Sequence, residues 1–297
     1  MIFVVGDLHG RADLLAAMLS EIETHAAGRP RRVIFLGDYI DRGPDSAGVL
    51  ARVRALQAED PDGVTCLMGN HEQMLLLARQ DAAARAVWLD NGGVATLASF
   101  GAADVSDLPR DVVAWISGLP TFAEDDVRYY VHAGLDPDTP LERQSDADRL
   151  WIREPFIGSD HDFGKHVVHG HTPVRLAQGS APLPDERDHR TNIDTGAVFG
   201  GALTAAVFTA GQVHPVGFIQ VRDDGEALFF SSKRQVLALI SRLSGPARAD
   251  GLNALKPPMA PPPGVSEPAP SYGRIAASAL ILGLAGLGVA YATLSPG

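Results

Sequence analysis

The sequence predicts an α/β fold, and two observations support this prediction. Through about residue 235, apolar strand-like runs alternate with longer segments that have helical periodicity. Several of the strand-like runs end in glycine followed by polar residues, and loops after strand ends are where α/β proteins carry their chemistry. Apolar residues make up 45% of the chain and charged residues 21%, a composition that excludes wholesale disorder.

The alternation is clearest in the first third of the chain and returns in strand-rich form later. The patterns predict strands at 1–5, 32–36 and 64–68, each followed by a helix, at 11–26, 46–59 and 71–82 respectively. More helical sequence fills 83–118. Further strands are predicted at 127–131, 166–168, 191–193, 203–208 and 213–221, with a hairpin turn near Gly211 joining the last two.

Charge and cysteine content narrow the classes of function. The formal net charge is −11, which argues against a nucleic-acid partner, because binding a phosphate backbone requires clustered Lys and Arg. Cys66 is the only cysteine, so an intrachain disulfide and a cysteine-built zinc site are both excluded. A transition-metal site would have to use His, Asp, Glu or Asn, and the chain has ten histidines.

Five short motifs follow predicted strands and carry residues that can bind metal. Three are early, GDLHG at 6–10, GDYIDRG at 37–43 and GNHE at 69–72; two are later, VHAG at 131–134 and GHT at 170–172. Mixed oxygen and nitrogen ligands of this kind suit Mn, Fe or Zn better than Ca or Mg. The number of ligands is sufficient for two ions that share an aspartate, and such a pair can activate water and hold phosphoryl oxygens.

The joint occurrence of these motifs, in this order, resembles the phosphoprotein phosphatase family of calcineurin-like metallophosphoesterases. The resemblance covers about residues 1–220 and is greatest to the bacterial and phage Ser/Thr protein phosphatase branch. It implies a β-sandwich of two mixed sheets flanked by helices (αββα). It also implies two divalent transition-metal ions, manganese first and iron or zinc as alternatives.

The resemblance also assigns roles to individual residues. Asp38 would bridge the two ions. The remaining metal ligands would be Asp7 and His9 for one ion, and Asn70, His132 and His171 for the other.

His71 would be the general acid that protonates the leaving oxygen, and Asp41 would orient its ring and keep it protonated. Arg42 and Arg153 would bind the phosphate, since guanidinium groups can do so in a bidentate manner.

Six further residues are expected to be structural. His169 is expected to pack or to support a ligand rather than bind metal. Glu72 is expected to cap the helix that begins after Asn70, and Asp194 to bind backbone in a turn. The three tryptophans are expected in the core; they are Trp88, Trp115 and Trp151.

The expected function is a metal-dependent protein phosphatase that uses a metal-activated water on phosphoserine or phosphothreonine in a phosphorylated protein. The alternative is a dinucleoside tetraphosphate hydrolase or a broad phosphoesterase. In the tetraphosphate branch the aspartate before Arg-Gly is usually alanine and GNHE tends to be GNHD, so Asp41 and Glu72 favour the protein phosphatase. A catalytically silent, membrane-tethered interaction module is disfavoured, because each assigned ligand position and the acid position is filled.

The composition changes near residue 245, so the catalytic domain is expected to span 1–244. Residues 245–274 contain eight prolines and are interpreted as a linker. Residues 275–294 carry no charge, and as a helix they would be about 30 Å long, which matches a bilayer core. The alternative for this segment is a buried core helix.

We therefore expect a single-pass tail anchor in the inner membrane. Lys256 and Arg274 precede the apolar segment and no charge follows it, so the positive-inside rule orients the catalytic domain toward the cytoplasm. Small residues such as Ala279 and Gly283 have the spacing that allows weak pairing of two such helices into a homodimer.

The tail interpretation predicts the result of cell fractionation. The full-length chain should sediment with membranes, because its apolar segment would be inserted. A chain ending at residue 244 should stay in the supernatant and keep its activity on small phosphoesters. A full-length chain that remains soluble after high-speed centrifugation would contradict the anchor.

Overall fold

The computed structural model describes residues 1–174 and 182–243. The predicted linker at 245–274 and the predicted membrane segment at 275–294 lie outside these ranges. Among the helices within them, none is long and apolar enough to span a bilayer.

The first sheet has six strands in the order β11-β10-β9-β1-β2-β3. β1 pairs in parallel with β2, and β2 with β3, whereas β9, β10 and β11 add antiparallel neighbours on the other side of β1. The bounds of these strands are β1 Ile2–Val5, β2 Arg32–Phe35, β3 Val64–Cys66, β9 Ala202–Phe208, β10 Gly217–Arg222 and β11 Ala227–Ser231.

The second sheet has five strands in the order β4-β5-β6-β8-β7. Its centre is parallel, with β6 between β5 and β8, and its two edge strands, β4 and β7, are antiparallel. The bounds are β4 Phe122–Glu124, β5 Arg128–Val131, β6 His166–His169, β7 Asp185–Glu186 and β8 Arg190–Asn192. Both sheets are therefore mixed, as the family resemblance implied.

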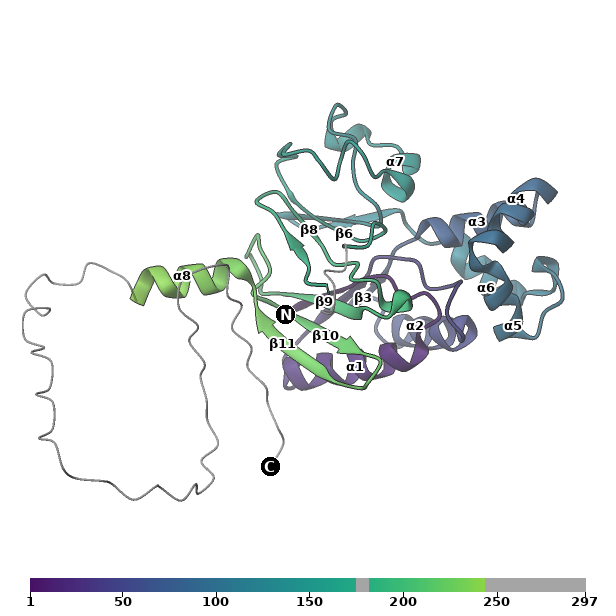
Figure 1. Cartoon of the computed structure of the whole chain (residues 1–297), viewed down its shortest axis with the longest axis horizontal. Coiled ribbons are helices and arrows are strands. Elements are labelled where there is room, and N and C mark those ends of the chain that lie inside the picture. Colours follow the sequence, from purple (N-terminus) through teal and green to yellow (C-terminus); the bar gives the residue numbers. More distant parts are fainter. Residues whose placement is uncertain (175–181, 244–297) are drawn as a thin grey trace, which may run out of the picture.

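Helices flank the two sheets (Figure 1). α1 and α2 pack on the first sheet, α3 to α6 extend from the carboxyl end of β3, and α7 lies beside the second sheet. α8 follows β11 and points away from the sandwich. The helix bounds are α1 Ala12–Ala26, α2 Ser46–Glu59, α3 Asn70–Ala78, α4 Ala82–Trp88, α5 Val94–Phe100, α6 Arg110–Ser117, α7 Asp146–Trp151 and α8 Lys233–Leu243.

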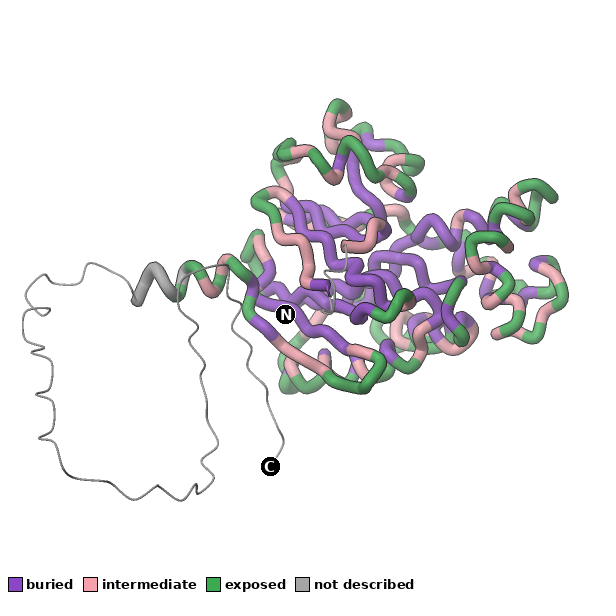
Figure 2. Tube along the Cα trace, in the orientation of Figure 1, coloured by how far each residue is buried: buried purple, intermediate pink, exposed green. Residues whose placement is uncertain are grey.

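The alternation of side chains in β1 explains how the layers pack. Phe3 and Val5 join the core that lies between the first sheet and the helices. Val4 faces the other way and meets Tyr130 and Val168 of the second sheet. Because β1 is buried on both faces (Figure 2), it appears in the sequence as a continuous apolar run rather than an alternating one.

Most predicted elements are present, and the differences have local causes. The predicted 71–82 helix is interrupted, since α3 ends at Ala78 and α4 begins at Ala82, where the Asp81 side chain accepts the N–H of Ala84. The last predicted strand begins at Gly217 rather than 213, because Pro215 has no donor for a ladder. The sequence did not predict the short elements β4, β7, β11 and α7, nor α8.

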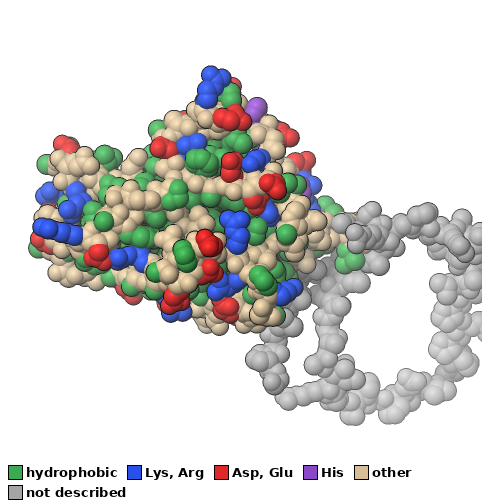
Figure 3. Space-filling view, turned by 180° about the vertical axis from the view of Figure 1, so that it is seen from behind, with side chains coloured by type: hydrophobic (Ala, Val, Ile, Leu, Met, Phe, Trp, Pro, Cys, Tyr) green, Lys and Arg blue, Asp and Glu red, His purple; other side chains and the backbone are tan. Residues whose placement is uncertain are grey.

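The outer surface carries both signs of charge. On the face shown in Figure 3, Lys and Arg side chains are interspersed with Asp and Glu, and hydrophobic side chains lie between them. No wide field of one sign is visible on this face.

The parallel strands of both sheets direct their carboxyl ends to a shared edge of the sandwich. β1, β2 and β3 reach this edge from one sheet, and β5, β6 and β8 reach it from the other. Loops that leave these ends can therefore meet, although they are far apart in the sequence.

Candidate active site

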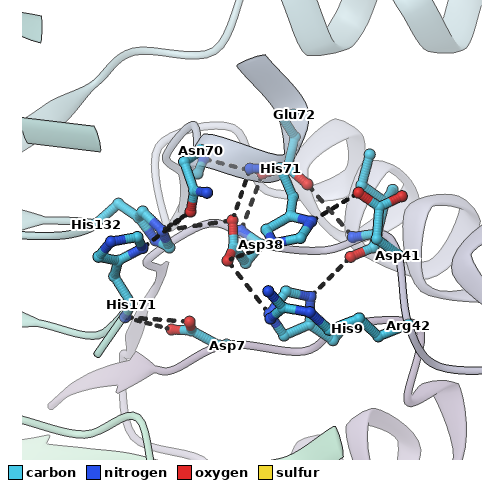
Figure 4. A network of polar contacts seen from close by, with 12 residues as sticks. Asp7, His9, Asp38, Asp41, Arg42, Asn70, His71, Glu72, His132 and His171 are labelled. Carbon is cyan, nitrogen blue, oxygen red and sulfur yellow. Dashed lines mark hydrogen bonds and ion pairs between the residues drawn. The ribbon is translucent and has the colours of Figure 1, made fainter. Parts of the chain in front are cut away.

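The residues predicted to bind metal and to catalyse come together at this edge (Figure 4). Each metal-ligand or acid candidate comes from a segment that directly follows one of the parallel strands, and each is buried. By strand, they are Asp7 and His9 after β1, Asp38 and Asp41 after β2, Asn70 and His71 after β3, His132 after β5, and His171 after β6.

Asp38 occupies the centre of the cluster. Its Oδ2 atom lies 3.3 Å from Nε2 of His9, and its Oδ1 atom lies 3.4 Å from Nε2 of His132. The Oδ1 atom also accepts the backbone N–H of His71 at 3.1 Å. One carboxylate therefore presents one oxygen to an imidazole on each side, which is the arrangement required of a bridging ligand.

Asn70 links the two later histidines. Its Oδ1 atom lies 2.9 Å from Nε2 of His132 and 3.0 Å from Nδ1 of His171. Together with Asp38, these side chains form a compact set of one carboxylate, one amide oxygen and two imidazoles.

His9 and His132 are each protonated at Nδ1, which leaves Nε2 free to bind a cation. Nδ1 of His9 donates to the carbonyl oxygen of Ile40 at 2.9 Å, and Nδ1 of His132 donates to that of Leu36 at 3.1 Å. Burial lowers the pKa of His132 to about 3, so the ring is neutral. Because Nδ1 carries the proton, Nε2 of His132 presents a lone pair to Oδ1 of Asn70, which is also an acceptor. Two acceptors that face each other without a proton can both bind a divalent cation.

Asp7 is held beside this cluster rather than within it. Its carboxylate accepts the backbone N–H of His171 at 3.1 Å, and burial, with Asp194 and Asp38 adding repulsion, raises its pKa well above the usual range. The tightest set near His9 instead unites His9, Asp38 and His71. A cation at this position would relieve the repulsion between the buried carboxylates.

His71 and Asp41 form a buried hydrogen-bonded pair. Nδ1 of His71 lies 2.7 Å from Oδ2 of Asp41, and this leaves Nε2 directed toward Asp38, 4.0 Å away. Burial raises the pKa of Asp41 to about 7, and burial with the charge of Arg42 lowers the pKa of His71 to about 3. Asp41 therefore holds the ring of His71 and leaves Nε2 free, but the lowered pKa of His71 goes against the expectation that Asp41 keeps the ring protonated, and the acid role stays a prediction.

Two residues that the sequence did not indicate hold Asp41 in place. Thr96 donates its hydroxyl to Oδ1 of Asp41 at 2.6 Å, and the indole N–H of Trp88 donates to Oδ2 at 2.9 Å. Both come from the helical 83–118 region, which contained no recognised motif. Trp88 was expected in the core and is fully buried, but it also acts as a donor to the site.

Glu72 fixes the loop that carries Asp38. It accepts the N–H of Gly69 at the start of α3, which confirms the predicted cap. It also accepts the N–H groups of Asp38 and Tyr39, each at 2.9 Å, so a single carboxylate joins the loops after β2 and β3.

Backbone strain is concentrated in the site. Among the described residues other than glycine, positive φ values occur at Ala27 and at five site residues. Such conformations cost energy and persist only where the surrounding structure imposes them, as at functional sites. The five are His9, Asp38, Asp41, Arg42 and His171.

The two arginines lie on the exposed side of the cluster. Nη1 of Arg42 is 2.6 Å from Nε2 of His9, and its guanidinium stands over the ring of Phe199 at 5.4 Å. Nη1 of Arg153 donates to the hydroxyl of Thr172 at 3.3 Å. Both side chains are exposed to solvent, so both are accessible to a phosphate, and their role in binding one stays a prediction.

The remaining expectations have mixed outcomes. His169 is buried against the ring of Phe156 and lies outside both metal clusters, as expected. Asp194 accepts the N–H of Gly196 as expected. Placing Trp151 in the core was wrong: it is 41% exposed, because it ends the short α7 and its ring approaches His171.

A sandwich that gathers buried carboxylates and imidazoles at one edge has the ligands to hold divalent metal ions. Residues 1–201 match the calcineurin-like phosphoesterase family. The chain belongs to the calcineurin-like metallophosphoesterases, a family that uses two divalent metal ions.

Relatives within this family carry different names. The chain is 34% identical over 215 residues to Serine/threonine-protein phosphatase 1 of Salmonella typhimurium, covering 69% of this chain and 90% of that protein. It is 28% identical over 229 residues to the asymmetrical bis(5'-nucleosyl)-tetraphosphatase PrpE of Anoxybacillus flavithermus. This match covers 68% of this chain and 88% of that protein. A crystal structure provisionally described as a diadenosine tetraphosphatase matches with a TM-score of 0.53 at 22% identity, covering 74% of this chain and 92% of that one.

The position of Asp38 predicts the effect of removing its charge. Asp38→Asn should lower phosphatase activity by at least about 100-fold, more than the loss of a residue that only supports a ligand. Bound metal, measured by elemental analysis, should fall from about two ions per chain. The exposed Asp138→Asn is the matched control and should change neither value. Full activity in chelator-treated protein would contradict the metal assignment.

The bond from Trp88 to Asp41 predicts a selective loss. Trp88→Phe removes one donor to a buried carboxylate and should lower kcat for an alkyl phosphate roughly tenfold while leaving KM unchanged. An aryl phosphate should be affected less, because its leaving group needs less help from an acid. Trp115→Phe is the control, since that indole donates to Gln57 on the outer side of the helices. An equal loss for both substrates would contradict this role.

Proposed function

We propose that this metallophosphoesterase is a phosphomonoester hydrolase that removes phosphate from phosphoserine and phosphothreonine in proteins. The observation that carries the proposal is the buried pair of His71 and Asp41, joined at 2.7 Å. The Salmonella relative, which is named a serine/threonine-protein phosphatase, supports the same substrate class.

The acid pair matters because leaving groups differ in their need for a proton. The alkoxide of serine or threonine is a strong base, so its departure requires protonation as the bond to phosphorus breaks. The phosphate leaving groups of a dinucleoside polyphosphate are far weaker bases and can depart unprotonated. Three side-chain groups donate hydrogen bonds to the buried carboxylate of Asp41: His71, Thr96 and Trp88, whose single N–H is shared between the two carboxylate oxygens. Such support of the carboxylate and its histidine suits the more basic leaving group.

The metal ions would be held by residues of the clusters described above, together with Asp7 beside them. One would bind to Asp7, His9 and Asp38, and the other to Asp38, Asn70, His132 and His171. When bound, a pair of divalent ions lowers the pKa of water and neutralises phosphoryl oxygens.

The chain's own groups would supply the rest of the reaction. Arg42 and Arg153 would hold the equatorial oxygens of the phosphate from the solvent side. Nε2 of His71 would give its proton to the leaving oxygen, and Asp41 would hold the ring and stabilise its protonated form. Burial first and Arg42 second lower the pKa of His71 to about 3, so this role requires the bound phosphate dianion to raise that pKa until Nε2 carries a proton.

A second candidate is hydrolysis of dinucleoside tetraphosphates. It is favoured by the Anoxybacillus relative, which is named for that activity and matches over a similar length. Turnover on phosphoserine, phosphothreonine and phosphotyrosine peptides, compared with diadenosine tetraphosphate, separates the two candidates. A kcat/KM that is higher for the tetraphosphate than for each peptide would overturn the first proposal.

The location of the enzyme is also a proposal. The uncharged segment at 275–294 supports a tail anchor in the inner membrane, with the catalytic domain in the cytoplasm.

The assignment of His71 predicts a dependence on the leaving group. His71→Asn should keep substrate binding and lower kcat for alkyl phosphates by roughly 10²–10⁴. The loss should shrink for p-nitrophenyl phosphate, whose leaving group departs without a proton. Metal content, measured on the same samples, is the control and should stay unchanged. Equal losses with alkyl and aryl substrates would show that His71 is not the acid.

A further inference from the structure

For the described residues of helix α8, Lys233–Leu243, the polar contacts with the body of the domain lie in the first turn. The backbone N–H of Lys233 donates to Oε1 of Glu186 at 3.0 Å, and the guanidinium of Arg234 pairs with the exposed carboxylate of Asp188. Beyond this turn the helix leaves the sandwich (Figure 1), and its residues are exposed or half-buried where the structure describes them (Figure 2).

The free part of α8 presents an uncovered apolar face. Leu237 is 54% exposed and Leu239 is 57% exposed. At roughly 100° per residue, these two leucines lie roughly 160° apart around the helix, with Val236 between them. Both edges of a broad apolar arc therefore face solvent, and the body of the domain does not cover them.

The charge of α8 is opposite to that of the chain as a whole. Its sequence contains Lys233, Arg234 and Arg242 and no acidic residue, in a chain with a net charge of −11. A helix with a wide apolar arc and basic polar residues is typical of helices that lie in a membrane interface. The 54 residues that follow α8 include the uncharged segment at 275–294.

We propose that α8 lies in the headgroup layer of an anionic bilayer, with Leu237 and Leu239 at the acyl boundary and its basic residues at the lipid phosphates. Charge complementarity favours an anionic bilayer as the surface that covers the exposed leucines of α8. A second copy of α8 on the leucines would bring like charges together, and the uncharged segment at 275–294 carries no charge that could complement the basic residues of α8. An anionic surface satisfies both the leucines and the cations.

The topology then fixes where the active site faces. β9 is antiparallel to β1, β10 to β9, and β11 to β10, so β11 runs opposite to β1. α8 follows the carboxyl end of β11, which lies at the amino end of β1, whereas the site lies at the carboxyl end of β1. With α8 on the membrane, the site opens away from the bilayer. Its substrates, under the proposed function, are then phosphoproteins that extend from the surface and not the lipid phosphates themselves.

A fluorescent label on α8 tests the contact directly in the full-length chain. Cys66 is buried, so Leu239→Cys can be labelled selectively with an environment-sensitive fluorophore. We expect its emission to shift to the blue on reconstitution into vesicles of phosphatidylcholine with phosphatidylglycerol. Ala83→Cys, exposed on α4, is the matched control and should not shift. Lys233→Gln, which leaves the pair between Arg234 and Asp188 intact, should weaken the interfacial binding of α8 by roughly fivefold.

The outcomes that overturn the proposal are distinct from a failure of the proposed function. They are a label that does not shift with anionic vesicles, an equal shift with phosphatidylcholine alone, or a shift without vesicles that accompanies dimerisation. Phosphopeptide turnover, measured separately, does not enter this readout. Hydrolysis of phosphatidic acid within the vesicles would overturn the orientation, because the site is expected to face away from that lipid.

Discussion

The position of the Asp38 carboxylate between two imidazoles is the constraint on which the rest of the site depends. Its two oxygens lie 3.3 Å and 3.4 Å from the Nε2 atoms of His9 and His132, which come from different sheets. Such a carboxylate is buried and surrounded by acceptors, so burial, with Glu72 adding repulsion, raises its pKa well above the usual range. The sandwich must therefore supply rigid support on both sides, and it does so by directing six parallel strands to one edge.

The support is mainly backbone hydrogen bonding to a second layer of buried acids. Glu72 accepts N–H groups from two loops, and the carboxylate of Asp41 accepts from Trp88 and Thr96. Gly43 shows how closely the loops must approach, since a Cβ there would lie 2.0 Å from the carbonyl oxygen of His9. The left-handed conformations of Asp38 and Asp41 are retained because these bonds are made, and their cost is offset by the buried core beneath them.

Much of the fold and the centre of the site could be predicted from the sequence. Strands such as β1 and β2 are continuous apolar runs because both of their faces are buried, and predicted ligands such as Asp7 and His9 follow directly at the strand ends. These features are local, so a short window of sequence contains them. The short edge strands, such as β7 with two residues, have too little periodicity to be recognised.

What the sequence could not provide is contact between distant segments. The indole of Trp88 reaches Asp41 across 47 positions, and Thr96 reaches it across 55. An isolated tryptophan in helical sequence is read as a core residue, and it is one here as well, so its N–H bond leaves no separate pattern. For Trp151 the prediction of burial was wrong. Its large apolar ring suggested a core position, but at the end of α7 it is exposed and lies near His171.

The same topology separates the chemistry of the domain from its attachment. The chain enters the first sheet at β1 and leaves it at β11, and both of these ends lie at the edge opposite the metal ligands. Residues that follow β11 can therefore change in length, charge or partner without disturbing Asp38 and its neighbours. The geometric demands of the active site therefore do not extend to the residues that follow β11.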